Sequence, residues 1–245
     1  MGGDLSAGLA IIGNEILSAK VVDENGPFLL GRLRALGVEV RRQLTVADEI
    51  DEIVWAIGSL RGSADWVLTT GGVGPTHDDV TIAGVARALG RKVVRSPELS
   101  GLVLSHFGPR VEEAAYRLAD VPEGAELLFQ PGIPFPVPLV DRVALLPGVP
   151  QLCRLQFEAL APRLHGRPFT LRVVFVSAGE PAIAAALGAV AADHPAVAIG
   201  SYPRFDRGAD HRVKLTLESR DGAAVTAALT DLLARLPPGC VLRQE

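Results

Sequence analysis

A glycine-rich loop followed by two aspartates is the part of this sequence best suited to chemistry. Residues 69–81 read TTGGVGPTHDDVT and continue the apolar run 66–68. A strand that passes through glycines into a helix leaves backbone N–H groups around a concavity, and such groups bind phosphate. The loop lacks the Gly-Lys-Ser/Thr of a P-loop and has His77 at the third glycine position of a dinucleotide fingerprint. The predicted phosphate-binding residues of this loop are Gly71, Gly72, Gly74 and Thr76.

The carboxylates beside this loop predict a metal ion. Asp78 and Asp79 would repel a bound phosphate unless a cation lies between them, and Mg²⁺ bridges carboxylate and phosphate oxygens. Asp48, which follows the predicted strand at residues 38–44, is a third predicted metal ligand. The alternative is helix capping: Thr76 pairs with Asp79 in a capping-box-like arrangement, and Asp48 is a plain N-cap.

Two further strand ends contribute candidates for the same crevice. Gly13, Asn14 and Glu15 follow the first apolar run, and Glu15 is the predicted general base or a further metal ligand. Pro147 and Gly148 end another strand and bring backbone against a ligand. The ends of neighbouring strands in a doubly wound sheet converge on one crevice, although both segments are also compatible with ordinary turns.

The elements that position these residues alternate between strand and helix patterns over residues 1–167. The predicted strands are residues 9–12, 38–44, 66–70 and 143–146, with helical spacing of apolar residues after Asp48 and Asp79. This alternation predicts a three-layer α/β/α fold with a mostly parallel sheet. Residues 130–138 are rich in proline, so we expect an ordered surface loop there, with neither regular helix nor central strand.

A break near residues 165–168 separates a second domain, residues 168–245. Strand patterns at 169–176, 197–202, 213–217 and 240–242 alternate with two helical segments in the order βαββαβ. This order predicts a small α+β, ferredoxin-like domain.

Composition excludes several classes of function. The 245 residues have a net charge of −4 and no Lys/Arg block, so we expect no nucleic-acid partner. Cys153 and Cys240 lie far apart without metal-ligand spacing, and no apolar run is long enough to span a membrane. We therefore expect a cytoplasmic protein with no membrane partner.

The glycine loop resembles the hallmark of the molybdopterin-binding domain family that includes MoaB and Mog proteins. Its Asp-Asp form is similar to the competence/damage-inducible protein A branch, as are GNEIL at 13–17, TVAD at 45–48, VPEGAELL at 121–128 and LPGVP at 146–150. The segments IGSYPRF at 199–205 and RVKLTLES at 212–219 resemble shorter members of this branch and the N-terminal region of eukaryotic FAD synthases. Departures are Gln151-Leu152-Cys153 after LPGVP and residues 130–134, which replace an expected Asn-x-x-Gly-Thr-Ala-Pro-Gly stretch.

The resemblance implies hydrolysis of a nucleoside-diphosphate-linked compound such as ADP-ribose or FAD, dependent on Mg²⁺, Mn²⁺ or Co²⁺. Asp48 and Asp79 match the family's acidic pair. A first alternative is a protein of molybdenum cofactor biosynthesis that binds a pterin phosphate or supports its adenylylation. A second is a non-catalytic nucleotide-binding module. We also expect a homo-oligomer, a dimer or a trimer, but no deamidase activity, because the domain that carries it in many relatives has no room here.

Overall fold

The computed structural model describes residues 4–206 and 208–245, and it divides the chain into two compact units, 1–167 and 168–245. Each unit has its own hydrophobic core and is described by itself. Among the described residues, none of the helices combines the length and apolar character that a membrane crossing requires.

The first unit is built on a six-stranded sheet of order β2-β1-β3-β8-β7-β6. The four strands β2, β1, β3 and β8 are parallel, and β7 and β6 add to them in antiparallel orientation. Their bounds are β1 Ser6–Ile12, β2 Glu39–Val46, β3 Trp66–Thr70, β6 Glu126–Leu128, β7 Val137–Val140 and β8 Val143–Leu146. The predicted mostly parallel sheet is confirmed.

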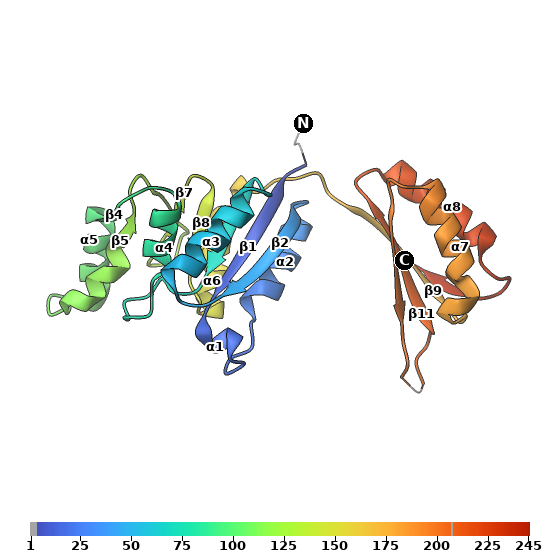
Figure 1. Ribbon diagram of the computed structural model, residues 1–245, viewed down its shortest axis with the longest axis horizontal. Helices are drawn as coiled ribbons and strands as arrows, with labels where there is room; N and C mark the ends of the chain where they lie inside the picture. Colours follow the sequence, from blue (N-terminus) through green and yellow to red (C-terminus); the bar gives the residue numbers. More distant parts are fainter. Residues whose placement is uncertain (1–3, 207) are drawn as a thin grey trace. The chain divides into compact units, whose positions relative to one another are not determined.

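Helices cover both faces of this sheet and complete the three predicted layers (Figure 1). Leu29 and Leu33 of α2 pack with Phe157 and Leu160 of α6 in the core on one face. Ile53 of α3 and Val85 of α4 belong to the core on the other face. The helices are α1 Asn14–Leu17, α2 Asn25–Ala35, α3 Ile50–Arg61, α4 Thr81–Ala88 and α6 Pro150–Leu160, with a short 3-10 turn η2 at Ala161–Arg163.

The prediction that residues 130–138 hold no central strand is wrong at their end. Strand β7 begins at Val137, includes Pro138 opposite Leu127, and has neighbours on both sides. Proline removes one backbone donor from a ladder. The loss is tolerated because β7 pairs with each neighbour over only two or three residues, so no long ladder is interrupted.

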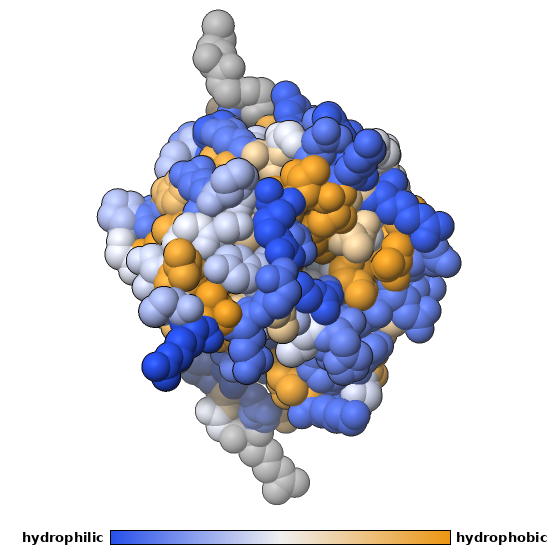
Figure 2. Space-filling model, turned by 90° about the vertical axis from the view of Figure 1, so that its left-hand side faces the viewer, coloured by the Kyte–Doolittle hydropathy of each residue, from blue (hydrophilic) through white to orange (hydrophobic). Residues whose placement is uncertain are grey.

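An excursion of short elements between α4 and β6 was not predicted from the sequence. It contains β4 Val93–Arg95, α5 Pro97–Phe107, the 3-10 helix η1 Glu113–Ala119 and β5 Asp120–Pro122. Leu99 and Val103 of α5 form its small core with Val121. Figure 2 faces this side of the unit and shows hydrophobic residues in separate groups among hydrophilic ones. Ala125, Leu127 and Phe135 from outside the excursion also pack against this core, and the face in Figure 2 has no single continuous apolar area.

The second unit is the predicted βαββαβ sandwich. Its antiparallel sheet has the order β10-β11-β9-β12, and α7 and α8 pack together against one face of it (Figure 1). Alternate residues of β11, such as Leu215 and Leu217, are buried in the core. The elements are β9 Thr170–Val176, α7 Glu180–Asp193, β10 Ala198–Pro203, β11 Val213–Ser219, α8 Gly222–Arg235 and β12 Val241–Gln244.

Candidate functional site

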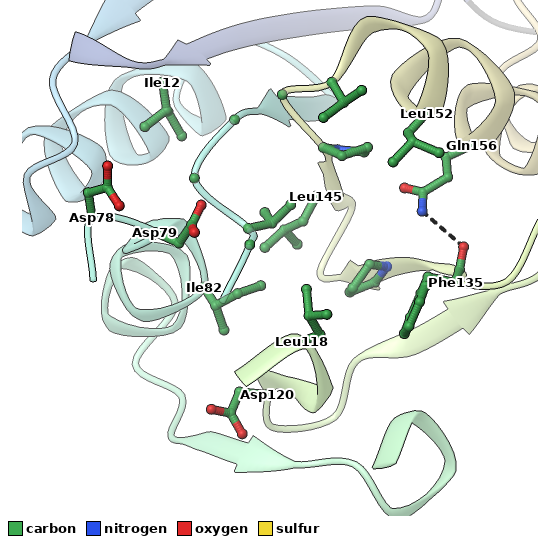
Figure 3. Close-up of a pocket in the computed structure, with 18 of the residues that line it drawn as sticks. Ile12, Asp78, Asp79, Ile82, Leu118, Asp120, Phe135, Leu145, Leu152 and Gln156 are labelled. Carbon is green, nitrogen blue, oxygen red and sulfur yellow. Dashed lines mark hydrogen bonds between the residues drawn. The ribbon is translucent and has the colours of Figure 1, made fainter. Parts of the chain in front are cut away.

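A pocket of about 490 Å³ lies in the first unit, where the parallel strands β1, β3 and β8 end. The crevice at the carboxyl ends of parallel strands is the usual ligand site of such sheets. Figure 3 shows Asp78 and Asp79 at one end of the pocket, Phe135 and Gln156 at the other, and Leu145 between them. The pocket thus has a carboxylate end and a largely apolar end.

The loop requires glycine at positions 71 and 72 because its backbone has left-handed φ angles and lies very close to neighbouring strand ends. Gly71 and Gly72 have φ angles of 103° and 63°, in the left-handed region that favours glycine. A Cβ on Gly71 would overlap the carbonyl oxygen of Ile12, and a Cβ on Gly148 would lie 3.3 Å from the Cα of Gly71. The loop therefore lies directly against the ends of β1 and β8, which leaves its outer side to the pocket.

Asp48 is held by the turn that follows β1. Its Oδ2 accepts a hydrogen bond from the backbone N–H of Asn14 at 2.7 Å. Its Oδ1 lies 3.5 Å from the position that a Cβ on Gly72 would occupy, so this oxygen faces the glycine loop. Helix α3 begins at Ile50 with Glu49 in the capping position. The N-cap interpretation of Asp48 is therefore wrong: its side chain joins two strand ends.

Asp79 and Thr76 do form the pair that the sequence predicts, but in the loop before the helix. Asp79 Oδ2 accepts hydrogen bonds from the backbone N–H of Thr76, at 2.8 Å, and from the Thr76 hydroxyl. Helix α4 begins at Thr81, and none of the side chains that the structure describes forms a capping hydrogen bond with it. The pair therefore closes a turn, and the expectation that Thr76 caps α4 is wrong.

A positive group, the guanidinium of Arg117, lies beside these aspartates. Arg117 of η1 donates a hydrogen bond to the backbone carbonyl of Asp79 at 3.2 Å. Hydrogen bonding, first from Thr76, together with the nearby His77 and Arg117, holds the pKa of Asp78 below its usual value. Asp78 is therefore ionised at neutral pH, as an oxygen ligand for a cation must be.

Two side chains that the sequence did not mark as site residues hold the loop in place. The Asn25 Nδ2 donates to Thr70 Oγ1 and to the carbonyl of Gly148, both at 2.8 Å. The Thr81 hydroxyl donates to the carbonyl of Gly71 at 2.8 Å. Asn25 and Thr81 are buried, so these bonds are shielded from water.

The apolar end of the pocket was also missed. Leu99, Leu118 and Asp120 come from the unpredicted excursion, Phe135 from the proline-rich loop, and Gln156 from α6. Gln156 had a detectable signal: Cys153, Gln156, Phe157 and Leu160 are buried at helical spacing. A polar residue among apolar residues on the buried face of a helix breaks the usual pattern, and such exceptions occur mainly at functional sites.

Most of the predicted site residues come together in this pocket. Glu15, Asp48, Asp78, Asp79, Gly71, Gly72, Gly74, Pro147 and Gly148 line it, whereas Gly13, Asn14 and Thr76 do not. Asn14 and Thr76 instead donate hydrogen bonds to the lining aspartates. Within the described residues, no three His, Cys, Asp or Glu side chains gather into a ready-made metal site. The predicted ligands Asp48, Asp78 and Asp79 thus share a pocket without forming a closed ligand cluster.

Comparison with known protein families divides the chain at the same place as the structure. Residues 8–166 match the model of the probable molybdopterin binding domain, and residues 168–245 match the FAD synthase middle domain. A crystal structure of the protein CinA from Thermoplasma acidophilum, described as being of unknown function, has a TM-score of 0.61 and 27% identity. It covers 66% of this chain and 98% of its own length.

Curated relatives extend the similarity across both units. A protein of Archaeoglobus fulgidus is 37% identical over 79% of this chain and 83% of its own length. A probable FAD synthase of Caenorhabditis elegans is 31% identical, and a CinA-like protein of Geobacter metallireducens is 34% identical, each over 93% of this chain. The chain spans 49% and 58% of those two longer proteins. The chain belongs to the molybdopterin-binding domain family, in the group related to CinA and FAD synthase.

Proposed function

We propose that this protein is a divalent-metal-dependent pyrophosphatase that cleaves a nucleoside-diphosphate-linked compound such as ADP-ribose or FAD. The observation that carries the proposal is that four of the five carboxylates lining the pocket, Glu15, Asp48, Asp78 and Asp79, share it with the glycine loop. Phosphate-binding backbone and carboxylates so close together call for a cation between them.

The donor set fits Mg²⁺ or a similar ion. Mg²⁺ prefers oxygen ligands, keeps several waters, and is usually bound by one or two carboxylates together with the phosphates of the substrate. A pocket with single carboxylates and no closed protein cluster among its described residues suits that mode of binding. Asp48 and Asp79 would hold the ion, with Asp78 as a further ligand. When bound, the ion would supply Lewis-acid stabilisation of the phosphoryl oxygens.

The chain's own residues would carry out the rest of the reaction. Hydrolysis adds one water across the P–O–P bridge, breaks one P–O bond and gives two phosphate monoesters, AMP and FMN in the case of FAD. N–H groups of Gly72 and Gly74 would bind the phosphate oxygens. Glu15 would accept the proton of the attacking water. The apolar end of the pocket would hold the nucleoside.

The proposal is tested by incubating the purified protein with ADP-ribose and with FAD in the presence of Mg²⁺, Mn²⁺ or Co²⁺. We expect mononucleotide release, measured by mass spectrometry, that EDTA abolishes. Asp79→Asn keeps an oxygen acceptor for Thr76 but loses the charge, so we expect it to lower the rate by about 10²-fold or more. Asp51→Asn, an exposed aspartate of α3 outside the pocket, is the matched control and should leave the rate unchanged.

Two outcomes would overturn the proposal. The first is the absence of any chelator-sensitive mononucleotide from a panel of dinucleotides. The second is equal rates for Asp79→Asn and Asp51→Asn. Binding of a pterin phosphate without hydrolysis of any nucleotide would instead favour a role in handling molybdopterin.

A further inference from the structure

Gln156 is a buried polar side chain at the apolar end of the pocket. Its residue surface is only 7% exposed, although it projects from the core-facing side of α6. Its Nε2 donates a hydrogen bond to the backbone carbonyl of Phe135 at 2.9 Å. A backbone carbonyl can only accept, so the amide must present its nitrogen there. The Oε1 atom therefore points into the pocket, as Figure 3 shows.

The surroundings of Gln156 suit a flat ring. Leu118, Leu152 and Phe135 line this end of the pocket together with Pro136 and Pro138. The ring of Phe135 is held edge to face by His106 of α5, with 5.7 Å between ring centroids. The Asp120 carboxylate, which also lines the pocket, accepts a hydrogen bond from Arg95 at 3.1 Å. A largely apolar slot with a fixed amide acceptor is a usual form of a site that binds a heteroaromatic ring and orients it by one edge.

Resting on the proposed function, we propose that Gln156 determines base specificity and selects a nucleobase that carries an exocyclic amino group, such as adenine. The amino group would donate to Oε1 while the ring lies between the apolar walls. A 6-oxo base such as hypoxanthine would set its carbonyl oxygen against Oε1, which leaves the buried acceptor unpaired. Sites built to make such a bond discriminate against analogues that lack the donor.

The experiment compares adenine and hypoxanthine ligands at two levels. Dissociation constants of AMP and IMP are measured by calorimetry with Mg²⁺, and kcat/KM is measured for ADP-ribose and its hypoxanthine analogue. For the unmodified protein we expect a preference for the adenine ligand of about 10-fold, the scale of one buried hydrogen bond. Gln156→Leu, which cannot accept, should bring the ratio to about 1. Gln151→Leu, at an exposed position on the same helix, should keep the original ratio.

The ratio of adenine-ligand to hypoxanthine-ligand affinity distinguishes base selection by Gln156 from a purely structural role. If Gln156→Leu weakens both ligands equally and keeps the preference, Gln156 only holds Phe135 and the inference is overturned. Failure of the unmodified protein to bind either nucleotide, or to distinguish them, also overturns it. Gln156→Met, of similar length, repeats the test if the leucine variant unfolds. Discrimination between AMP and IMP without hydrolysis of any dinucleotide would support the inference and refute the pyrophosphatase activity.

Discussion

Replacing Gly74 with alanine is expected to displace the Asp79 carboxylate without straining the backbone. Gly74 does not have a left-handed φ, so an alanine is compatible with its conformation. Its Cβ, however, would lie 2.6 Å from Asp79 Oδ2 and 3.1 Å from both Cγ and Oδ1 of Asp79, so the three nearest heavy atoms all belong to that carboxylate. The added methyl group therefore acts on the tip of one flexible side chain.

The effect on stability should be small. Moving Asp79 removes at most its two hydrogen bonds from Thr76, which lie at an exposed part of the loop. At about 0.5–1 kcal/mol each, their loss lowers the free energy of unfolding by about 1–2 kcal/mol. For a unit of this size, that corresponds to a fall in melting temperature of about 2–8 °C, measurable by calorimetry. The fold should therefore remain intact at assay temperature.

The effect on the proposed hydrolysis should be much larger. If Asp79 holds the metal, Gly74→Ala should lower kcat/KM by about 10²- to 10³-fold, as the loss of one preorganised electrostatic contact does. The change acts through Asp79, so the double variant Gly74→Ala/Asp79→Ala should be no slower than Asp79→Ala alone. Residues that act through one interaction show this non-additivity, whereas independent sites add.

Gly31→Ala is the matched control. Gly31 is an exposed residue of α2 with no heavy atom within 4 Å of an added Cβ. This change should leave the rate unchanged and raise stability by about 0.5–1 kcal/mol, because alanine favours helix. Full activity of Gly74→Ala would refute the assignment of Asp79. A further loss in the double variant would show that Gly74 acts on the phosphate directly and not through Asp79.

Three further predictions concern stability and reactivity. Asn25→Ala removes two buried hydrogen bonds that join strand ends and should lower the free energy of unfolding by about 2–4 kcal/mol in denaturant titration; a change below about 0.5 kcal/mol would contradict this role. Burial raises the pKa of the Cys153 thiol to about 11, so iodoacetamide at mildly alkaline pH should modify it only after unfolding. Rapid alkylation of the native protein would show that the thiol is exposed. Hydrogen bonds from Arg243 and then His211 lower the pKa of Asp210 to about 2. The folded-state pKa lies below the usual value, so this carboxylate stabilises the protein above pH of about 4 and less as pH falls towards 2. Asp210→Asn should therefore lower the melting temperature at neutral pH but not near pH 2, and an equal decrease at both pH values would contradict it.

The sequence predicted the carboxylate end of the site because its residues belong to local patterns. An apolar strand, a glycine run and a helix follow one another directly at residues 66–88, so periodicity and turn chemistry locate the loop. Parallel strands converge at one edge, which is why Glu15 and Asp48 were expected beside that loop. What the local patterns left open was the hydrogen-bond partner of each carboxylate. Asn14 lies 34 residues from Asp48, so their contact depends on strand order.

The apolar end could not be predicted in the same way. Strands β4 and β5 have three residues each, and Val93 and Val94 are exposed, so no hydrophobic period marks them. Strand β5 is placed by packing of Val121 in the cluster that contains Val103 of α5, and β4 is placed by its pairing with β5. The proline-rich loop lies at the surface as predicted, but nothing in its sequence indicated that Phe135, or Pro138 of β7, would line the pocket. Among these pocket residues, Gln156 alone could have been identified from the sequence, as a polar residue at helical spacing among apolar ones.

Capping and metal binding were treated as alternatives for Asp48 and Asp79, but a carboxylate has two oxygens. Asp48 uses Oδ2 to accept from the Asn14 N–H, while Oδ1 faces the glycine loop. Asp79 likewise uses Oδ2 for the Thr76 turn. A hydrogen bond on one oxygen holds the other in a set direction, which is how supporting contacts orient a metal ligand. In the proposed metal site, the structural role of each aspartate would direct its second oxygen towards the ion. A substitution that removes the charge but keeps the turn tests that proposed role alone.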